Sequence, residues 1–142
     1  MFLASHTPFQ PITGIVVDIE RLTEGKLNFR QVLYTGKNLQ LVLMTIQPSD
    51  EIGEEVQVDR DQFFRVESGE GEAWIDRTRM HFKNEDGFIV PAGAKHNVVN
   101  TGTTILRLYT IYGPPEHRDG TVHTTSVEAK AFSERFDGKT TE

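Results

Sequence analysis

Short apolar or alternating segments follow one another from residue 29 to residue 112, and none of them keeps a helical period over a useful length. Turn-forming residues separate these segments, at 35–38, 48–50, 68–71, 84–87 and 100–102. Strands of this length and spacing are typical of a small all-β sandwich or barrel. The sequence therefore predicts strands at 29–34, 39–46, 62–67, 72–76, 87–90, 96–99 and 104–112, and an outward-facing strand around 77–82.

The size and composition of the chain fit one soluble globular domain. Its 142 residues are enough for a single core but few for two, and 37% of them are hydrophobic and 25% charged. No apolar run approaches the roughly 20 residues of a membrane span, and the first residues lack the basic and apolar pattern of a signal peptide. Since the chain also contains no cysteine, disulfide and thiolate chemistry are excluded, and we expect a cytoplasmic protein.

The net charge of −6 argues against nucleic acid and against an anionic membrane surface as partners, because both attract clustered Lys and Arg. Acidic residues concentrate in one short segment, at Asp50, Glu51, Glu54, Glu55, Asp59 and Asp61. Such a patch attracts cations and repels anions. The alternative is an acidic loop that is simply solvated.

The segment 39–46 is apolar on both alternating faces, so that both faces need a cover. A second sheet can cover one of them. Another subunit can cover the other, which predicts a homodimer, unless the N-terminal arm folds back over the same face. Within that arm, residues 14–19 are a further candidate strand at the edge of the sheet.

The residues after the last predicted strand favour a loop and a short helix. Two prolines follow residue 113 and cannot continue a strand ladder. Thr125 and Glu128 form a capping-box pattern for a helix that runs to about Phe136, and the polar residues 137–142 are expected to be frayed. The predicted organisation is an N-terminal arm at 1–28, a β-barrel at 29–112, and a C-terminal loop with a short helix at 113–142.

The run at 91–100 has the spacing P-x-G-x-x-H-x-x-x-N. Pro91 fixes one backbone torsion and Gly93 permits a positive φ, which together favour a tight turn. After the turn, His96 and Asn100 fall on one face of a strand, because successive side chains alternate. The spacing therefore predicts one imidazole that points into the barrel.

This run and an upstream segment together resemble the two sequence motifs of the cupin superfamily. Residues 63–71, Phe-Phe-Arg-Val-Glu-Ser-Gly-Glu-Gly, look like the strand–turn–strand of the first motif, and residues 87–100 match the second almost without gaps. More narrowly, residues 36–122 are similar to small single-domain cupins often labelled mannose-6-phosphate-isomerase-like. The resemblance implies a double-stranded β-helix, which is a jelly-roll-like barrel.

In that family, two histidines and a glutamate of the first motif and a histidine of the second bind a divalent metal ion inside the barrel. Counting back from Gly69 puts the acid at Gln62. The histidine pair then falls on Glu55 and Gln57, and only His96 has the family's ligand type. The resemblance thus implies a metal set of Glu55, Gln57, Gln62 and His96, with nickel, manganese or iron ahead of zinc. The alternative is a metal-free pocket in which the glutamines and His96 hydrogen-bond one another or a ligand.

Three functions are compatible with these residues. The first is a metal-dependent enzyme, isomerase-like or a dioxygenase, that acts on a small polar molecule such as a sugar or a hydroxy or keto acid. In it Glu55 is a ligand or base, and His117 is an acid or base, since its loop resembles the Pro-Pro-Glu-His segment of similar cupins. The alternative for His117 is an exposed loop residue with no role. The second function is a non-catalytic cupin that binds a small metabolite in a degraded, metal-free site, and the third is a dimeric scaffold.

Overall fold

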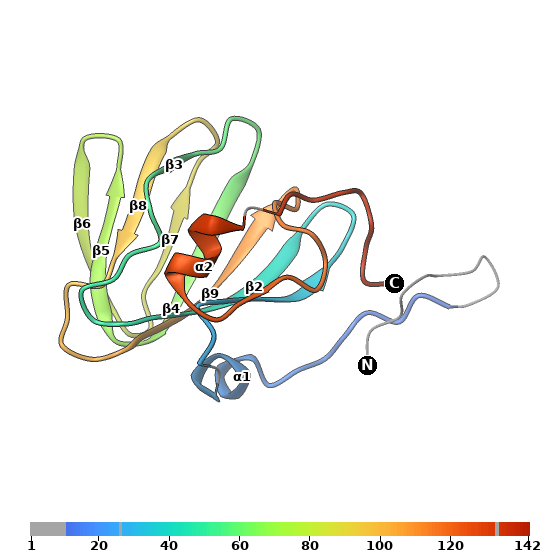
Figure 1. The fold of residues 1–142 in the computed structure, drawn as a ribbon, viewed down its shortest axis with the longest axis horizontal. Coiled ribbons are helices and arrows are strands. Elements are labelled where there is room, and N and C mark those ends of the chain that lie inside the picture. The colour runs from blue at the N-terminus through green and yellow to red at the C-terminus, as the bar shows by residue number, and fades with distance from the viewer. Residues whose placement is uncertain (1–10, 26, 133) are drawn as a thin grey trace.

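Two antiparallel β-sheets face each other and enclose the core (Figure 1). The computed structural model describes residues 11–25, 27–132 and 134–142. One sheet has the strand order β10-β1-β2-β9-β4-β7, with bounds Val122–His123, Arg30–Thr35, Gln40–Ile46, Leu106–Gly113, Asp61–Ser68 and Gly87–Val90. The other has the order β3-β8-β5-β6, with bounds Glu55–Val56, Lys95–Val99, Glu70–Ile75 and Thr78–Lys83. This arrangement confirms the predicted all-β, double-stranded β-helix architecture.

The alternating pattern of the sequence locates most of the strands. Each strand predicted from that pattern overlaps an observed one, and the outward strand predicted around 77–82 is β6. The sequence does not predict β3 or β10. Each of them has only two residues, which is too short to show an alternating pattern.

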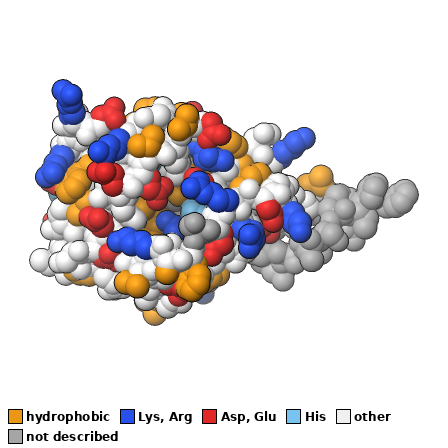
Figure 2. Space-filling model, turned by 45° about the horizontal axis from the view of Figure 1, so that its top comes forward, with side chains coloured by type: hydrophobic (Ala, Val, Ile, Leu, Met, Phe, Trp, Pro, Cys, Tyr) orange, Lys and Arg blue, Asp and Glu red, His pale blue; other side chains and the backbone are white. Residues whose placement is uncertain are grey.

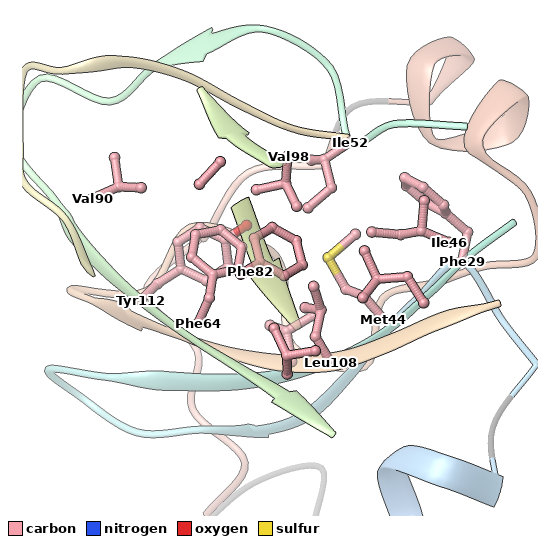
Figure 3. Packing of buried hydrophobic residues seen from close by; sticks show 14 of the residues in the cluster. Phe29, Met44, Ile46, Ile52, Phe64, Phe82, Val90, Val98, Leu108 and Tyr112 are labelled. Atoms are coloured by element: carbon pink, nitrogen blue, oxygen red, sulfur yellow. The ribbon is translucent and has the colours of Figure 1, made fainter. Parts of the chain in front are cut away.

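Side chains from both sheets meet in one apolar core (Figure 3). Along β9, Leu106, Leu108 and Tyr112 are buried and alternate with half-buried residues, as a strand with one face on the core requires. Aromatic rings fill the middle of the core: Phe88 of β7 stacks on Phe64 of its own sheet and on Phe82 of the other sheet, with ring centroids 4.7 Å and 5.1 Å apart. Burial of one large apolar side chain contributes about 1.5–3 kcal/mol to stability, so these contacts hold the two sheets together.

The N-terminal arm covers the outer face of the six-stranded sheet. Residues 14–18 form no strand, which corrects the prediction of an edge strand there. Instead, helix α1 (Ile19–Gly25) begins where the Asp18 carboxylate accepts a hydrogen bond from the Arg21 N–H, and it packs against β2, β4 and β9. Leu43 of β2 is therefore only 1% exposed although it lies outside the core cluster. For this face the sequence left two covers open, a second subunit or the N-terminal arm, and the arm with α1 lies on it. A homodimer stays a prediction.

The C-terminal helix α2 (Ser126–Ala131) has the predicted cap. The Thr125 hydroxyl accepts a hydrogen bond from the Glu128 N–H at 3.1 Å. The helix ends at Ala131, with Phe132 as its C-cap, rather than near Phe136, because the Phe136 N–H donates to the carbonyl oxygen of Glu116 instead of continuing the helix. Neither helix in the described residues is long or apolar enough to cross a lipid bilayer.

The last residues are held against the barrel, which corrects the prediction of a frayed end. Thr141 is 1% exposed, and its N–H donates to the carbonyl oxygen of Thr35. The Glu142 carboxylate accepts hydrogen bonds from the Gly14 N–H and from the Tyr34 hydroxyl. The bond from Tyr34 is the largest of the causes that lower the pKa of Glu142 to about 2. The hydrogen bonds of Glu142 with Gly14 and Tyr34, which we call the clasp, therefore tie the N-terminal arm and β1 to the end of the chain.

Two glycines of the predicted motifs have conformational or steric roles. Gly93 has a φ of +88°, the left-handed conformation that the turn before β8 requires. At Gly71 in β5, a Cβ atom would overlap the carbonyl oxygen of Val99 in β8 and lie 2.9 Å from Cζ of Phe82. Any side chain at Gly71 would push these strands apart.

Candidate functional site

A cavity of about 360 Å³ opens beside α2 and is lined by segments that lie far apart in the sequence. We call it the mouth cavity, and its polar wall includes Arg30, Glu55, Gln57, Glu116, His117 and His123. Figure 2 shows one face of the molecule on which a histidine side chain lies recessed among acidic, basic and apolar side chains. Five buried polar residues, Arg30, Gln57, Glu116, His117 and His123, thus converge on one accessible space.

Two arginines line the mouth cavity: Arg30, which is buried, and Arg135, which is exposed. In the sheet, Arg30 stands opposite Met44 of β2 and His123 of β10. Its Nη1 lies 3.3 Å from Nδ1 of His123, whose Nε2 lies 2.7 Å from the Glu134 carboxylate. The second pair is close enough for an ion pair but is not aligned for a hydrogen bond. Although Arg30 is only 5% exposed, its Nε has no hydrogen-bond partner in the described part of the chain.

A fully buried glutamine, Gln40 of β2, fixes the loop after β9. Its amide oxygen accepts hydrogen bonds from the N–H groups of Glu116 and His117. Its amide nitrogen donates to the carbonyl oxygen of His117 and to a neighbouring hydroxyl. In the sheet, Gln40 stands opposite Tyr112, and Tyr112 stands opposite Gln62. This polar row across three strands positions His117 on the wall of the cavity.

His117 is buried and uncharged near neutral pH. Burial, followed by the nearby charge of Arg30, holds the pKa of His117 well below its ordinary value of 6.5. Its Nε2 lies 3.3 Å from the hydroxyl of Tyr112, whose own pKa burial raises. Burial also raises the pKa of the neighbouring Glu116, against the effect of nearby arginines. His117 is therefore not the exposed loop residue of the alternative prediction, and it can hydrogen-bond a ligand in its neutral form.

The structure brings together only part of the residue set predicted from the family motifs. Glu55 and Gln57 line the mouth cavity, where Gln57 Nε2 donates to the Glu55 carboxylate at 3.1 Å. Glu55 also stands opposite His96 in the pairing of β3 with β8. Gln62 donates to the Thr110 hydroxyl at 3.0 Å, and neither Gln62 nor His96 lines the cavity. The amide oxygens of Gln57 and Gln62 are buried without a hydrogen-bond partner in the described residues.

These contacts also test the metal centre that the family resemblance implies. No three side chains of Asp, Glu or His gather into a group that could hold a metal ion within residues 11–25, 27–132 and 134–142. The predicted set would supply one carboxylate, one imidazole and two uncharged amide oxygens. Zinc and iron sites are built mainly from imidazole, thiolate and carboxylate groups. The set therefore does not fit a tightly held transition metal.

The sequence does not single out Arg30, Gln40 or His123 as site residues. Arg30 and Gln40 sit in predicted strands at inward positions, where a polar residue needs a partner, and that is the signal that could have found them. His123 belongs to β10, which has no readable pattern. Its contact with Arg30 joins residues 93 positions apart.

A double-stranded β-helix around one core, with a polar cavity at its mouth, defines a small single-barrel protein of the jelly-roll type. Residues 42–112 match the family described as the cupin domain. The chain belongs to the cupin family.

Two individual relatives are similar to the chain over most of its length. The chain is 42% identical over 122 residues to the uncharacterized protein YrkC of Bacillus subtilis, a match that covers 82% of this chain and 66% of YrkC. The chain thus spans just under two thirds of that relative's length. It is 36% identical over 111 residues to the uncharacterized protein L612 of Acanthamoeba polyphaga mimivirus, covering 75% of this chain and 69% of L612.

Among solved structures, the chain is similar to BH2720 from Bacillus halodurans, with a TM-score of 0.83 and 38% identity. This match covers 93% of the present chain and 100% of BH2720. The barrel and most of its flanking segments therefore have a counterpart in that structure. The narrower mannose-6-phosphate-isomerase-like type stays a prediction.

Proposed function

We propose that the protein binds a small polar metabolite in the mouth cavity without a tightly held metal ion. The observation that carries this proposal is two buried polar atoms on residues of the cavity wall that have neither a hydrogen bond nor an ion pair in the described residues: Nε of Arg30, a donor, and Oε1 of Gln57, an acceptor. Buried polar groups are normally hydrogen-bonded, and an unsatisfied one costs about 1–3 kcal/mol. A bound ligand would supply both missing partners.

Thermal denaturation in the presence of a library of small polar metabolites tests this function. A ligand at 100 times its Kd stabilises the folded state by about 2.7 kcal/mol, which is a readily measured rise in melting temperature. Gln57→Met should weaken binding of any hit about tenfold, because it removes a hydrogen bond on the cavity wall. Gln47→Met, the same change at an exposed residue, is the matched control. The proposal is wrong if no metabolite stabilises the protein, or if Gln57→Met binds the hit as the wild type does.

A metal-dependent isomerase or dioxygenase is the second candidate, with His117 as an acid or base and Glu55 as a metal ligand or a base. Its ligands would be Glu55, Gln57, Gln62 and His96. Two observations favour it. Glu55 of β3 stands opposite His96 of the neighbouring strand β8, and the amide oxygens of Gln57 and Gln62 lack hydrogen-bond donors in the described residues. A cation, like a hydroxyl group, would satisfy those oxygens.

Elemental analysis separates the two candidates. The protein is purified without a chelator or a nickel column and then titrated with nickel, manganese, iron and zinc. Stoichiometric metal would favour the enzyme, whereas protein that stays metal-free at micromolar ion would exclude it. A cytoplasmic location and a homodimer stay predictions beside both candidates.

A further inference from the structure

Arg30 carries a buried charge that pairs with no carboxylate in the described part of the chain. The side chain belongs to a residue only 5% exposed, and it is absent from the ion pairs that the described residues form. A guanidinium group is a permanent cation, and an unpaired buried ion costs several kcal/mol. One of its N–H groups faces His123, and its Nε–H faces no acceptor. The arrangement calls for an anionic partner.

The acidic side chains around the mouth cavity are already engaged. Glu116 accepts a hydrogen bond from Arg135 and Glu55 accepts one from Gln57, both at 3.1 Å, and Glu134 lies within ion-pair distance of His123, at 2.7 Å. None of them forms an ion pair with Arg30 among the described residues. The anion therefore has to come from a ligand.

The surroundings of Arg30 favour a carboxylate over a phosphate. The Nε–H and one Nη–H of a guanidinium form a planar fork that matches the two oxygens of a carboxylate. The cavity wall carries three acids, Glu55, Glu116 and Glu134, against two arginines, Arg30 and Arg135, and the chain has a net charge of −6. A phosphate dianion would therefore meet about twice the net repulsion that a carboxylate monoanion meets. A single negative charge is the best match.

The remaining wall of the cavity requires hydrogen-bond donors from the ligand. Gln57 Oε1 is a buried acceptor without a donor, and the Glu55 carboxylate beside it accepts only. Hydroxyl groups provide such donors without adding charge. A volume of about 360 Å³ lies at the small end of ligand pockets and suits a molecule of a few carbon atoms.

We propose that the ligand of the mouth cavity is a small hydroxy-carboxylic acid, with its carboxylate on the Arg30 guanidinium and its hydroxyl groups on Gln57 and Glu55. This assignment rests on the ligand-binding function proposed above. It makes Arg30 a specificity-determining residue that selects acids over neutral polyols.

Calorimetric titration with matched sets of probes tests the assignment. Each set holds one hydroxy acid, the polyol of the same length and the plain carboxylic acid: glycerate, glycerol and propanoate; threonate, threitol and butanoate; gluconate, sorbitol and hexanoate. In at least one set, the hydroxy acid should bind at least tenfold more tightly than both of its analogues. Arg30→Met should weaken that binding on the order of 100-fold, whereas Arg77→Met, at an exposed arginine, should leave it unchanged.

A second measurement keeps the test decisive if Arg30→Met folds poorly. The Nε–H signal of Arg30 in ¹⁵N NMR spectra, assigned by its loss in Arg30→Lys, should shift when the hydroxy acid is added. If no hydroxy acid binds better than its polyol, or if the Arg30 signal does not move on binding, the assignment is wrong. Binding of polyols as tight as that of the acids would overturn the carboxylate assignment while the metabolite-binding function stands. A protein that binds none of the probes and no member of the metabolite library would overturn both.

Discussion

Replacing Arg30 by methionine should make the ligand-free protein more stable. In most proteins, truncating a buried polar residue destabilises the fold, because its partners lose their bonds. Arg30 differs because its charge is buried without a carboxylate partner in the described residues, so that only the His123 bond and the Phe29 ring, 5.3 Å from Cζ of Arg30, offset its desolvation, and they do so in part. Methionine keeps most of the aliphatic length of the side chain and removes the charge.

The expected gain follows from two opposing contributions. Removing an unpaired buried cation relieves a desolvation penalty of several kcal/mol. Losing the bond from Arg30 to His123 Nδ1, at 3.3 Å, removes about 1.5–3 kcal/mol of favourable interaction. The balance is a stabilisation of about 1–2 kcal/mol. For a chain of this size, about 4 °C per kcal/mol gives a rise in Tm of about 4–8 °C.

Urea denaturation followed by circular dichroism measures this difference. The protein is first unfolded and refolded to remove any bound metabolite, because a retained ligand would stabilise only the wild type. The m-value should not change, and Arg77→Met should stay within about 0.5 kcal/mol of the wild type. A loss of 1 kcal/mol or more in Arg30→Met would refute the reasoning, because it would mean that the fold already satisfies the charge.

Three further predictions concern stability and local structure. Gly71→Ala should destabilise the fold by about 2–3 kcal/mol in urea denaturation, because the added Cβ overlaps the backbone of β8. Gly25→Ala is the control: the space around Gly25 is open, so stability should change by less than about 1 kcal/mol. The pKa of His117 is lower in the folded protein than in the unfolded chain, so that the unfolded chain takes up a proton at His117 first, near pH 6.5. Stability should therefore fall as the pH drops below 6.5. His117→Gln should reduce the slope of stability against pH by at most about 1.4 kcal/mol per pH unit. Glu142→Ala should speed hydrogen exchange at the Gly14 amide at least tenfold, and equal exchange rates would show that the clasp does not hold the arm.

The fold could be predicted largely from local patterns. The alternating segments locate the long strands, because burial of one face imposes a period of two. The turn at Gly93 and the cap at Thr125 were predictable for the same reason, since each depends on a few adjacent residues. The predicted strand at 14–19 was wrong. An apolar run alone does not distinguish a β-strand from an extended arm that leads into a helix packed on the sheet.

The mouth cavity could be predicted only in part, because it depends on contacts between distant segments. The motif spacing located Glu55 and Gln57, which do line the cavity. It centred the site on His96, whereas the cavity wall holds Arg30 and His123. Those two residues meet through β10, whose position depends on the path of the loop after β9. No local pattern specifies that path.

The three inward glutamines show why a structure was needed to separate structural from ligand-facing polar residues. In the sequence, Gln40 and Gln62 are equivalent, since each is a polar residue in a predicted strand, and only the motif spacing draws attention to Gln57. In the structure, Gln40 has partners for its oxygen and its nitrogen, while the oxygens of the other two have none among the described residues. His123 Nε2 and Glu134 Oε2 on the cavity wall also lack a hydrogen bond, but they lie 2.7 Å from each other. The other two unpartnered atoms on residues of the wall are of opposite kinds: an acceptor on Gln57 and a donor on Arg30. A metal ion could satisfy the first and an inorganic anion the second. A molecule that carries both an acceptor and a donor can satisfy the two at once, which is why an organic ligand fits the cavity better than either ion.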